Sequence, residues 1–517
     1  MTKPQTLFLI IGLLSFVVYG YTLAPTITWR NDGADSGDLA TAVAVGGVPH
    51  PPGYPTYLIL GEVFKLLPFG DVAYRLNLLS ATCAALTVAV VGLVIHQILS
   101  AAIQPQLQVK EEADQAQSLI GFCAVSASLA LAFSGAFWSQ AVIAEVYTLQ
   151  LLFTAVLLYG ALQVQSTNEK WLVPSLADLM GLSLGNHPSI LLLLPLLIWA
   201  LKARWHWRLV VAVLLAFCVG LSVYMIIPIR AASFPPVNWG MATTWPDFLW
   251  LVSAEPYHQF VFSLPWEFVP ARIVVELRLL AEAFMGWGLP VGLLGLQRLF
   301  RFNRSLAYSS LITFFLISVY AIGYNTTDSH VYLLPAFLIF SVWIGWGLYD
   351  CGSVLQKFMA SRLRSSSLII GGGIIFLPLL SLLLNYPAQN ISQDDEAYAF
   401  AQESLQIVAQ GAVIITDDDP RTFALWYGRY GLALRPDVAI VNSNLLPYAW
   451  YRQTLRQTHA HLLFPNEASP PATALSAFIE LNLANSPIYL TTLQPPLLEN
   501  YHLESAKHLQ RVVELDR

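Results

Sequence analysis

The sequence predicts a polytopic α-helical membrane protein that ends in a soluble α/β domain. Of its 517 residues, 56% are hydrophobic and only 11% are charged, and the mean hydropathy is +0.58. An ordinary soluble protein carries roughly 25% charged residues. This composition excludes a soluble enzyme, a disordered chain and a nucleic-acid-binding protein with a basic face, so we expect no nucleic acid among the partners.

The few charges are divided unevenly along the chain. Residues 1–385 carry 18 basic and 18 acidic side chains, whereas residues 386–517 carry 8 basic and 14 acidic ones and hold the entire net charge of −6. We therefore predict two domains, a membrane body at 1–385 and a water-soluble domain at 386–517.

The membrane body contains about eleven apolar segments that approach the roughly 20 residues a spanning helix needs. Residues 172–202 are interrupted at His187 and form either one broken span or two short ones. The first segment shows no cleavage-site pattern and is expected to remain as an anchor. The candidates are 7–24, 76–100, 118–135, 147–164, 172–186, 188–202, 208–229, 274–297, 306–324, 331–351 and 366–384.

The basic residues predict the orientation, because Lys and Arg gather on the cytoplasmic side. With a cytoplasmic N-terminus, eleven spans place the C-terminal domain outside, and twelve basic residues fall at cytoplasmic span ends. We expect a multi-pass membrane protein with this topology. The twelve are Lys3, Lys110, Lys170, Lys202, Arg204, Arg208, Arg298, Arg301, Arg304, Lys357, Arg362 and Arg364.

The first outer loop, 25–75, carries the most concentrated polar pattern. Asp35 and Asp38 are three residues apart, and a helix opening at Ser36 or Gly37 would place both at its N-terminal end, where the helix dipole favours carboxylates. Such a pair can act as a general base, bind a cation or merely cap the helix. A proline-rich block, His50–Pro55, follows it. The apolar stretch 57–67 is too short to span and suits an interfacial helix, with Glu62 and Lys65 paired on one face.

Further polar residues fall at outer span ends. Glu145 is either an interfacial anchor or part of a site, and His187 either binds free backbone at a helix break or serves a site. Asp328 and His330 lie two residues apart on the same side. Because ionisable groups near the bilayer are costly and usually functional, this one-sided gathering predicts a single outward-facing site.

Several of these blocks resemble a known family. They are D-S-G-D at 35–38, H-P-P-G-Y-P at 50–55, R-L-N-L-L-S at 75–80, A-E-V-Y at 144–147 and G-L-S-L-G-N-H at 181–187. Together with the D-D-D, L-W-Y and R-P-D-V blocks of the tail, they resemble bacterial relatives of the transmembrane-protein-260 family of protein O-mannosyltransferases, within the C-type glycosyltransferase superfamily. The family's first-loop motif usually reads D-S-G-E, whereas this chain has Asp38 in the final position.

The resemblance implies a hexosyltransferase that takes a sugar from a polyprenyl-phosphate carrier and passes it to a protein or glycan on the outer face. It carries the role of catalytic base onto Asp35, with Asp38 as its neighbour. Attack by a single activated hydroxyl would invert the anomeric centre. Substrate or phosphate contacts are expected from His50, Arg75, Glu145, His187, Arg230, Asp328 and His330, with Arg272 as a further candidate, because Arg and His can bind phosphate oxygens. No cofactor is firmly predicted, although a divalent metal is possible.

The tail after 385 predicts alternating helices and strands, hence a small α/β domain. We expect a helix at 394–410 and strands at 412–416, 438–441 and 488–491. Asp419 should cap a helix that begins at Pro420. The run Asp417 to Asp419 fits either a metal site or a helix N-terminus that attracts acids. The domain is expected to help recognise the acceptor.

Two other functions remain open. A transporter or flippase for lipid-linked saccharides would place polar residues at mid-membrane and often shows an internal repeat. An assembly protein would carry its activity in residues 386–517. No Walker A, G-x-G-x-x-G, C-x-x-C or H-E-x-x-H pattern supports a soluble-enzyme alternative.

Overall fold

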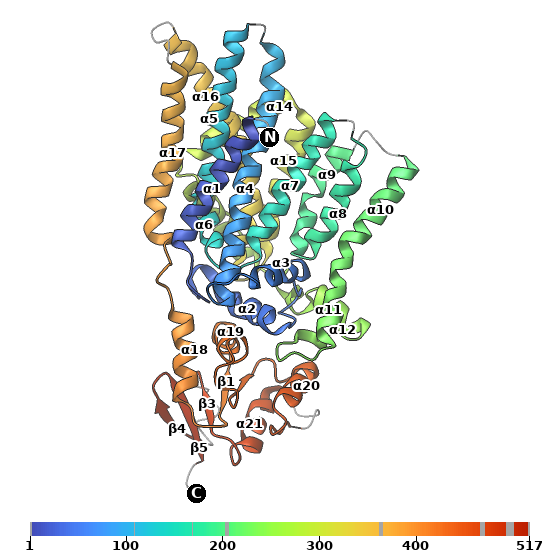
Figure 1. The fold of residues 1–517 in the computed structure, drawn as a ribbon, viewed down its shortest axis with the longest axis vertical. Coiled ribbons are helices and arrows are strands. Elements are labelled where there is room, and N and C mark those ends of the chain that lie inside the picture. The colour runs from blue at the N-terminus through green and yellow to red at the C-terminus, as the bar shows by residue number, and fades with distance from the viewer. Residues whose placement is uncertain are drawn as a thin grey trace.

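The computed structural model describes residues 3–107, 109–167, 169–201, 206–360, 366–465, 471–492 and 501–514. A long helical bundle occupies one end of the molecule, and a small sheet domain lies at the other, with short helices between them (Figure 1). Four of the twelve basic residues used for orientation, Lys202, Arg204, Arg362 and Arg364, lie outside the described residues.

Each of the eleven predicted apolar segments forms helix. The helices are α1 (Lys3–Thr22), α4 (Val72–Ile103), α5 (Lys110–Ala132), α7 (Tyr147–Ser166), α8 (Leu172–Leu184), η3 with α9 (Pro188–Leu193 and Leu194–Leu201), α10 (Trp207–Leu221), α13 (Val269–Ala283) with α14 (Gly288–Phe302), α15 (Arg304–Gly323), η8 with α16 (Ser329–Leu333 and Leu334–Ala360) and α17 (Ser366–Gln389). Within the described ranges, eight helices are long and apolar enough to cross a membrane, or nine if the bent α13–α14 pair counts as one span. The stretches 172–184 and 188–201 are two separate, shorter apolar helices.

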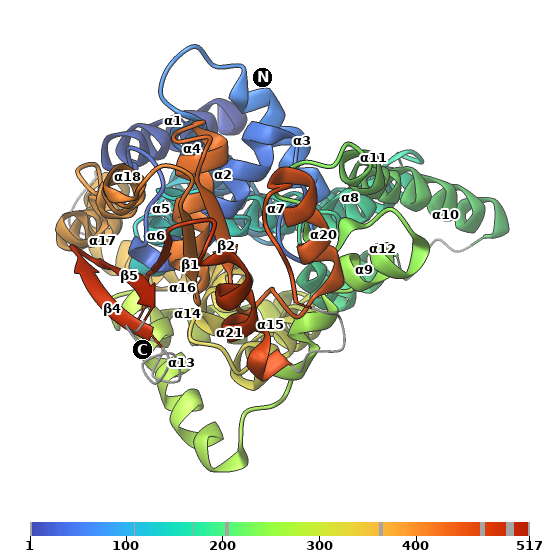
Figure 2. The same cartoon turned by 90° about the horizontal axis from the view of Figure 1, so that it is seen from below.

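The prediction of a single straight helix at 274–297 is wrong. The chain bends by 93° between α13 and α14, because Met285 and Gly286 adopt left-handed conformations with φ of 53° and 71°. A left-handed residue cannot continue a right-handed helix. Seen from below, α13 and α10 project beyond the rest of the bundle (Figure 2).

The bundle is built around η8–α16 and α4. In the η8–α16 span, 94% of the apolar window is buried, whereas only 17% is buried in the span that contains α10. α4 packs against α1, α5 and α7, and α16 packs against α14 and α5. The peripheral helices therefore expose the apolar side chains that a bilayer would cover.

Short helices close the end of the bundle that faces the tail. They are α2 (Ser36–Val45), α3 (Pro55–Lys65), α6 (Gly135–Ala141), α11 (Ile226–Ala231) and α12 (Trp245–Val252). α3 is the predicted interfacial helix, and its Glu62–Lys65 ion pair forms at 2.8 Å. α2 lies between the bundle and the tail (Figure 1).

The tail is a five-stranded sheet with helices, in the strand order β2-β1-β3-β5-β4. The three expected strands form as β1 (Val413–Thr416), β2 (Ala439–Asn442) and β3 (Ile488–Leu490), all parallel, with Val413 opposite Ala439 and Ile488. An antiparallel hairpin, β4 (Tyr501–Ala506) and β5 (Leu509–Glu514), completes the sheet and was not predicted, because β4 is half-exposed and lacks an apolar run.

The helices of the tail are α18 (Glu396–Ile407), α19 (Asp419–Trp426), α20 (Ala449–Thr458) and α21 (Pro471–Asn482). Two of these four helices, α18 and α19, correspond to predicted helices with shifted ends, and α20 and α21 were not predicted individually. The cap of α19 is Asp418 rather than Asp419, because Asp418 is extended and its Oδ1 accepts a hydrogen bond from the Arg421 amide at 3.0 Å. Asp419 therefore begins the helix instead of capping it.

Candidate functional site

The first loop places its two acids in different surroundings. α2 begins at Ser36, as predicted, so Asp35 precedes the helix and Asp38 lies in its first turn. Asp38 is completely buried, whereas 37% of the Asp35 side chain is accessible. Although the sequence spacing groups these carboxylates, only Asp35 can meet a substrate.

Asp38 holds His50 in place. Its Oδ2 accepts hydrogen bonds from the His50 backbone amide at 2.8 Å and from Nδ1 of the same ring at 2.7 Å. The Trp239 indole N–H donates to Oδ1 at 3.3 Å. Because Nδ1 is occupied, Nε2 is directed toward the Tyr54 hydroxyl at 3.0 Å and the Asp35 carboxylate at 3.4 Å. The proline-rich block thus presents an imidazole whose orientation is fixed by a buried acid.

The two carboxylates make His50 a cation over a wide pH range. Burial alone would lower the pKa of His50, but the charge of Asp35 and the hydrogen bond and charge of Asp38 outweigh it and raise the pKa to about 9. Burial raises the pKa of Asp35, while the His50 charge opposes that rise. The arrangement is therefore a partly desolvated carboxylate kept beside a fixed imidazolium.

Asp35 and His50 open into a cavity of about 410 Å³, a size typical of small-molecule sites. Three acids, three histidines and six tyrosines line it, and no Lys or Arg does so in the part of the chain that the structure describes. These side chains are Asp35, Asp328, Asp419, His50, His187, His258, Tyr54, Tyr147, Tyr257, Tyr320, Tyr324 and Tyr332. A wall so rich in hydroxyl groups and aromatic rings suits a polyhydroxylated ligand.

His187, at the break between α8 and η3, lines the same cavity, whereas Glu145, just before α7, is buried and is not part of the lining. Glu145 is 3% exposed, and burial, followed by the Asp35 charge, raises its pKa well above the ordinary value. The His187 ring lines the cavity, contacts Tyr147 and Tyr332, and is within hydrogen-bond distance of the Ser189 hydroxyl at 2.8 Å. Burial and the His50 charge lower its pKa to about 4, so His187 is neutral.

Two predicted phosphate contacts lie outside the cavity lining. Arg75 donates to the carbonyl oxygens of Phe69, Lys65 and Gly70, and so fixes the loop after α3. Arg230 is 9% exposed, pairs with Glu62 at 2.7 Å and donates to the Gly47 carbonyl at 3.1 Å. The structure does not bring either guanidinium to Asp35, because carbonyl and carboxylate groups of the surrounding loops already bind both.

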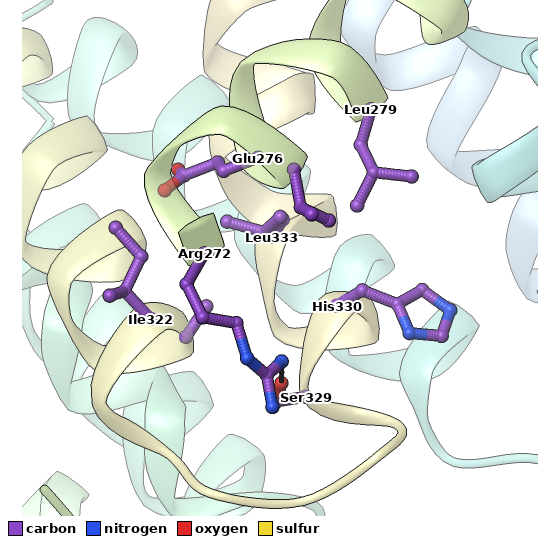
Figure 3. A pocket seen from close by; sticks show the side chains of 9 residues that line it. Arg272, Glu276, Leu279, Ile322, Ser329, His330 and Leu333 are labelled. Carbon is purple, nitrogen blue, oxygen red and sulfur yellow. Dashed lines mark hydrogen bonds between the residues drawn. The ribbon is translucent and has the colours of Figure 1, made fainter. Parts of the chain in front are cut away.

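The segment between α15 and η8 divides its polar residues between two spaces. Asp328 lines the main cavity, whereas His330 lines a small neighbouring pocket and lies 3.4 Å from Asp32. In that pocket Arg272 of α13 donates to the Ser329 hydroxyl at 2.6 Å (Figure 3). Arg272 also donates to the Thr326 carbonyl at 2.9 Å. Arg272 thus anchors the segment between α15 and η8 on the side of the small pocket, and Asp328 of the same segment lines the main cavity.

The tail contributes two residues that sequence reasoning did not place in the site. α19 packs against α2, where the Phe423 ring stacks on His50 with 6.1 Å between centroids, and Asp419 lines the cavity. The acidic run at 417–419 was the signal, but nothing in the sequence paired it with the first loop. Among the described residues, no group of three or more His, Cys, Asp or Glu side chains is placed to hold a metal ion.

The fold defines the class of protein. ArnT from Cupriavidus metallidurans in the apo state aligns with a TM-score of 0.58 at 12% identity, covering 97% of this chain and 96% of that chain. ArnT bound to undecaprenyl phosphate aligns with a TM-score of 0.56 at 13% identity, covering 98% of each chain. The predicted fold class is therefore confirmed: this is a multi-pass helical membrane protein with the C-type glycosyltransferase fold and a small sheet domain at its C-terminal end.

The sequence comparisons identify the particular relatives. The family model "Protein O-mannosyl-transferase TMEM260 N-terminal domain" matches residues 35–211, and "TMEM260-associated domain 2" matches 397–462. Protein O-mannosyl-transferase TMEM260 of Mus musculus is 24% identical over 489 residues, covering 87% of this chain and 65% of its own length. The Dictyostelium discoideum protein of that name is 21% identical over 538 residues, covering 92% and 62%.

These matches confirm the resemblance predicted from the first-loop and tail motifs. The chain spans just under two thirds of the length of these curated relatives.

Proposed function

We propose that this chain is a glycosyltransferase that moves a hexose from a polyprenyl-phosphate carrier to a hydroxyl group of a protein or glycan. The observation that carries the proposal is the accessible Asp35 carboxylate, held 3.4 Å from the His50 imidazole in the lining of a cavity of about 410 Å³. The names of the curated relatives and the undecaprenyl phosphate in one ArnT structure support the acceptor chemistry and the carrier class.

In this proposal Asp35 is the general base. It takes the proton of the acceptor hydroxyl as that oxygen attacks the anomeric carbon of the donor. The new bond joins acceptor oxygen to that carbon, the bond from the carbon to the phosphate oxygen breaks with its electron pair, and the polyprenyl phosphate leaves. A single displacement of this kind inverts the anomeric centre.

The imidazolium of His50 has two roles in the scheme. Its charge favours the ionised form of Asp35, which burial opposes, and it offsets the negative charge that develops on the leaving phosphate. The neutral ring of His187 and the tyrosine hydroxyls supply hydrogen bonds. We assign Asp328, which lines the main cavity, to sugar contacts, and the buried Glu145 to the charge environment of Asp35 and His50. Arg75, Arg230 and His330 hold the surrounding loops, since none of these three lines the main cavity.

We further propose that the protein resides in the bacterial inner membrane, with a cytoplasmic N-terminus and the C-terminal domain outside. The contact between α2 and α19 supports a location of the first loop and the tail on the same side of the membrane. The positive-inside bias supports the direction. The partners in this setting are the lipid-linked donor, the acceptor and the bilayer, with no metal ion assigned a role.

The test uses purified full-length protein in lipid nanodiscs, with mannosyl-phosphoryl-undecaprenol as donor probe and a Ser/Thr-containing peptide as acceptor probe. Asp35→Asn should lower kcat by roughly 10²–10⁴-fold, the range expected for loss of a general base. Glu267→Gln, an exposed acid outside the cavity, should leave the rate unchanged. Equal transfer by Asp35→Asn and the wild type would remove Asp35 as the base.

The transporter hypothesis makes the opposite prediction for the same preparation. Vesicles that move the lipid-linked sugar across the bilayer without forming any covalent product would favour it over the glycosyltransferase.

A further inference from the structure

The tail helix α19 is fixed to the first loop at three points. The Trp29 indole N–H donates to the Pro420 carbonyl at 3.1 Å. The Phe423 ring stacks on His50. A Cβ added at Gly37 would lie 2.6 Å from the Phe423 carbonyl oxygen, so the two backbones touch. Side-chain and backbone contacts together therefore determine where the first residue of α19, Asp419, is held.

Asp419 is directed into the cavity without a local partner. Its neighbour Asp418 caps α19 and binds the Arg421 guanidinium at 2.6 Å. Asp419 is exposed and lines the cavity with Asp35, His50 and Tyr257. Among the described residues no group donates a hydrogen bond to its carboxylate. A carboxylate has room for several donors, so this one is available to a ligand.

We infer that Asp419, supplied by the C-terminal domain, is an acceptor-binding residue: its carboxylate and that of Asp35 hold the hydroxyl-bearing acceptor between them. The inference rests on the proposed glycosyl transfer and extends it from the donor to the recognition of the acceptor. It also assigns the tail a direct place in the site.

The geometry of displacement separates the acceptor side of the cavity from the donor side. A lipid-linked donor is tethered in the membrane, so its phosphate must lie toward the helix bundle, where His187, Tyr147 and Tyr332 line the wall. The nucleophile approaches opposite the leaving group, with reacting atoms about 3–3.5 Å apart. The acceptor must therefore enter from the side away from the bundle, and α19 lies on that side (Figure 1).

The charge of the cavity indicates the kind of acceptor. Asp35, Asp328 and Asp419 line it with His50, and the domain that carries Asp419 holds 14 acidic and 8 basic residues. Acidic groups of the acceptor, placed beside its reacting hydroxyl, would be repelled by the carboxylates of the cavity. Backbone N–H groups and basic side chains of the acceptor could instead donate hydrogen bonds to those carboxylates. The acceptor is therefore a neutral or basic segment, and a polypeptide with Ser or Thr fits this description.

The test compares two Ser/Thr peptides that differ only in one Lys or Glu next to the reacting residue, with mannosyl-phosphoryl-undecaprenol as donor. Wild-type protein should show a KM about tenfold lower for the Lys peptide. Asp419→Asn should raise the KM for the Lys peptide about tenfold, erase most of the Lys/Glu difference and leave the donor KM unchanged. Asp419→Glu should restore the preference, and Asp395→Asn, an exposed acid elsewhere on the same domain, should behave as wild type.

The outcomes separate this inference from the proposed function. If wild-type protein transfers sugar but Asp419→Asn keeps the peptide preference and KM, the acceptor role of Asp419 is wrong and the glycosyltransferase stands. If Asp419→Asn raises donor and acceptor KM alike and melts at a lower temperature, the residue serves the fold and the inference is overturned. If wild-type protein transfers no sugar to either peptide, both proposals fall.

Discussion

The phenyl ring of Phe423 lies nearly parallel to the imidazole of His50, with the planes 14° apart and the centroids separated by 6.1 Å. The two residues come from opposite ends of the chain, one from the tail helix α19 and the other from the first loop. A cation over an aromatic face is stabilised by about 0.5–2 kcal/mol when it is partly desolvated. Phe423 therefore favours the protonated form of His50 while it joins the two domains.

Replacing this ring should alter both functions of the contact. Phe423→Leu is expected to lower transfer about tenfold or more, because α19 and the cavity wall shift relative to Asp35. The alkaline limb of the rate profile should also move to lower pH. Steady-state kinetics between pH 5 and 10 measure both effects. Phe464→Leu, which removes a ring packed on Phe478 inside the tail, should change neither.

The pH profile of transfer should be bell-shaped. Activity rises with pH as Asp35 loses its proton, at a pH above the ordinary Asp value because burial raises its pKa. It falls as the pH passes about 9, where His50 loses its charge. A rate that stays constant from pH 7 to 11 would show that the His50 charge is not needed.

The same pKa shift predicts a change in stability. The folded-state pKa of His50 lies above its ordinary value of 6.5, so the stabilisation from its carboxylate partners is complete below about pH 6.5 and is lost as the pH rises through about 9. The melting temperature should therefore drop between pH 6.5 and 9 more in the wild type than in His50→Gln. Identical pH dependence in both proteins would contradict this assignment.

Asp38 should act through His50 rather than on the substrate. Asp38→Asn removes the buried charge that fixes the ring, so the pKa of His50 should fall and kcat should decrease roughly 100-fold. The KM for donor and acceptor should change little, since Asp38 is fully buried. The diagnostic measurement is the alkaline limb, which should move from about pH 9 toward neutrality; a limb that stays in place would refute the positioning role.

The substitution Gly37→Ala tests domain docking, because its effect on helix propensity and its steric effect change the stability of the protein in opposite directions. Alanine in a helix is favoured over glycine by about 1 kcal/mol, so Gly37→Ala should stabilise α2 in isolation. In the folded protein the added Cβ would meet the Phe423 backbone at 2.6 Å. We expect a lower melting temperature and faster proteolytic release of the tail. A stabilised protein with an intact tail would show that α19 is not held against α2.

Local patterns predicted the parts of the site that lie within one segment. The spacing of Asp35 and Asp38 predicted that both lie at the start of a helix. In the structure His50, from the proline-rich block, contacts both. Arg75 and Arg230 were chosen by charge and side alone. The structure uses them to bind loop carbonyls and Glu62, which no local pattern can indicate.

Long-range contacts account for what was missed. The bend at Met285 and Gly286 is hidden in an apolar run, because a single glycine there does not by itself end a helix. Pro420 predicts a helix cap at Asp419, yet the cavity that Asp419 lines depends on the docking of α19 against a segment near the other end of the chain. The residue preferences of a short stretch of sequence carry no information about the docking of α19 on the first loop.

The docking of α19 on α2 has a consequence for biogenesis. The cavity remains incomplete until α19 (Asp419–Trp426) has been synthesised and has docked, so a shorter nascent chain lacks part of the cavity wall. The tail must also reach the same side of the bilayer as the first loop. A molecule that misinserts a single span would leave Phe423 and Asp419 on the opposite side of the membrane from His50, so a topological error would prevent the cavity from forming.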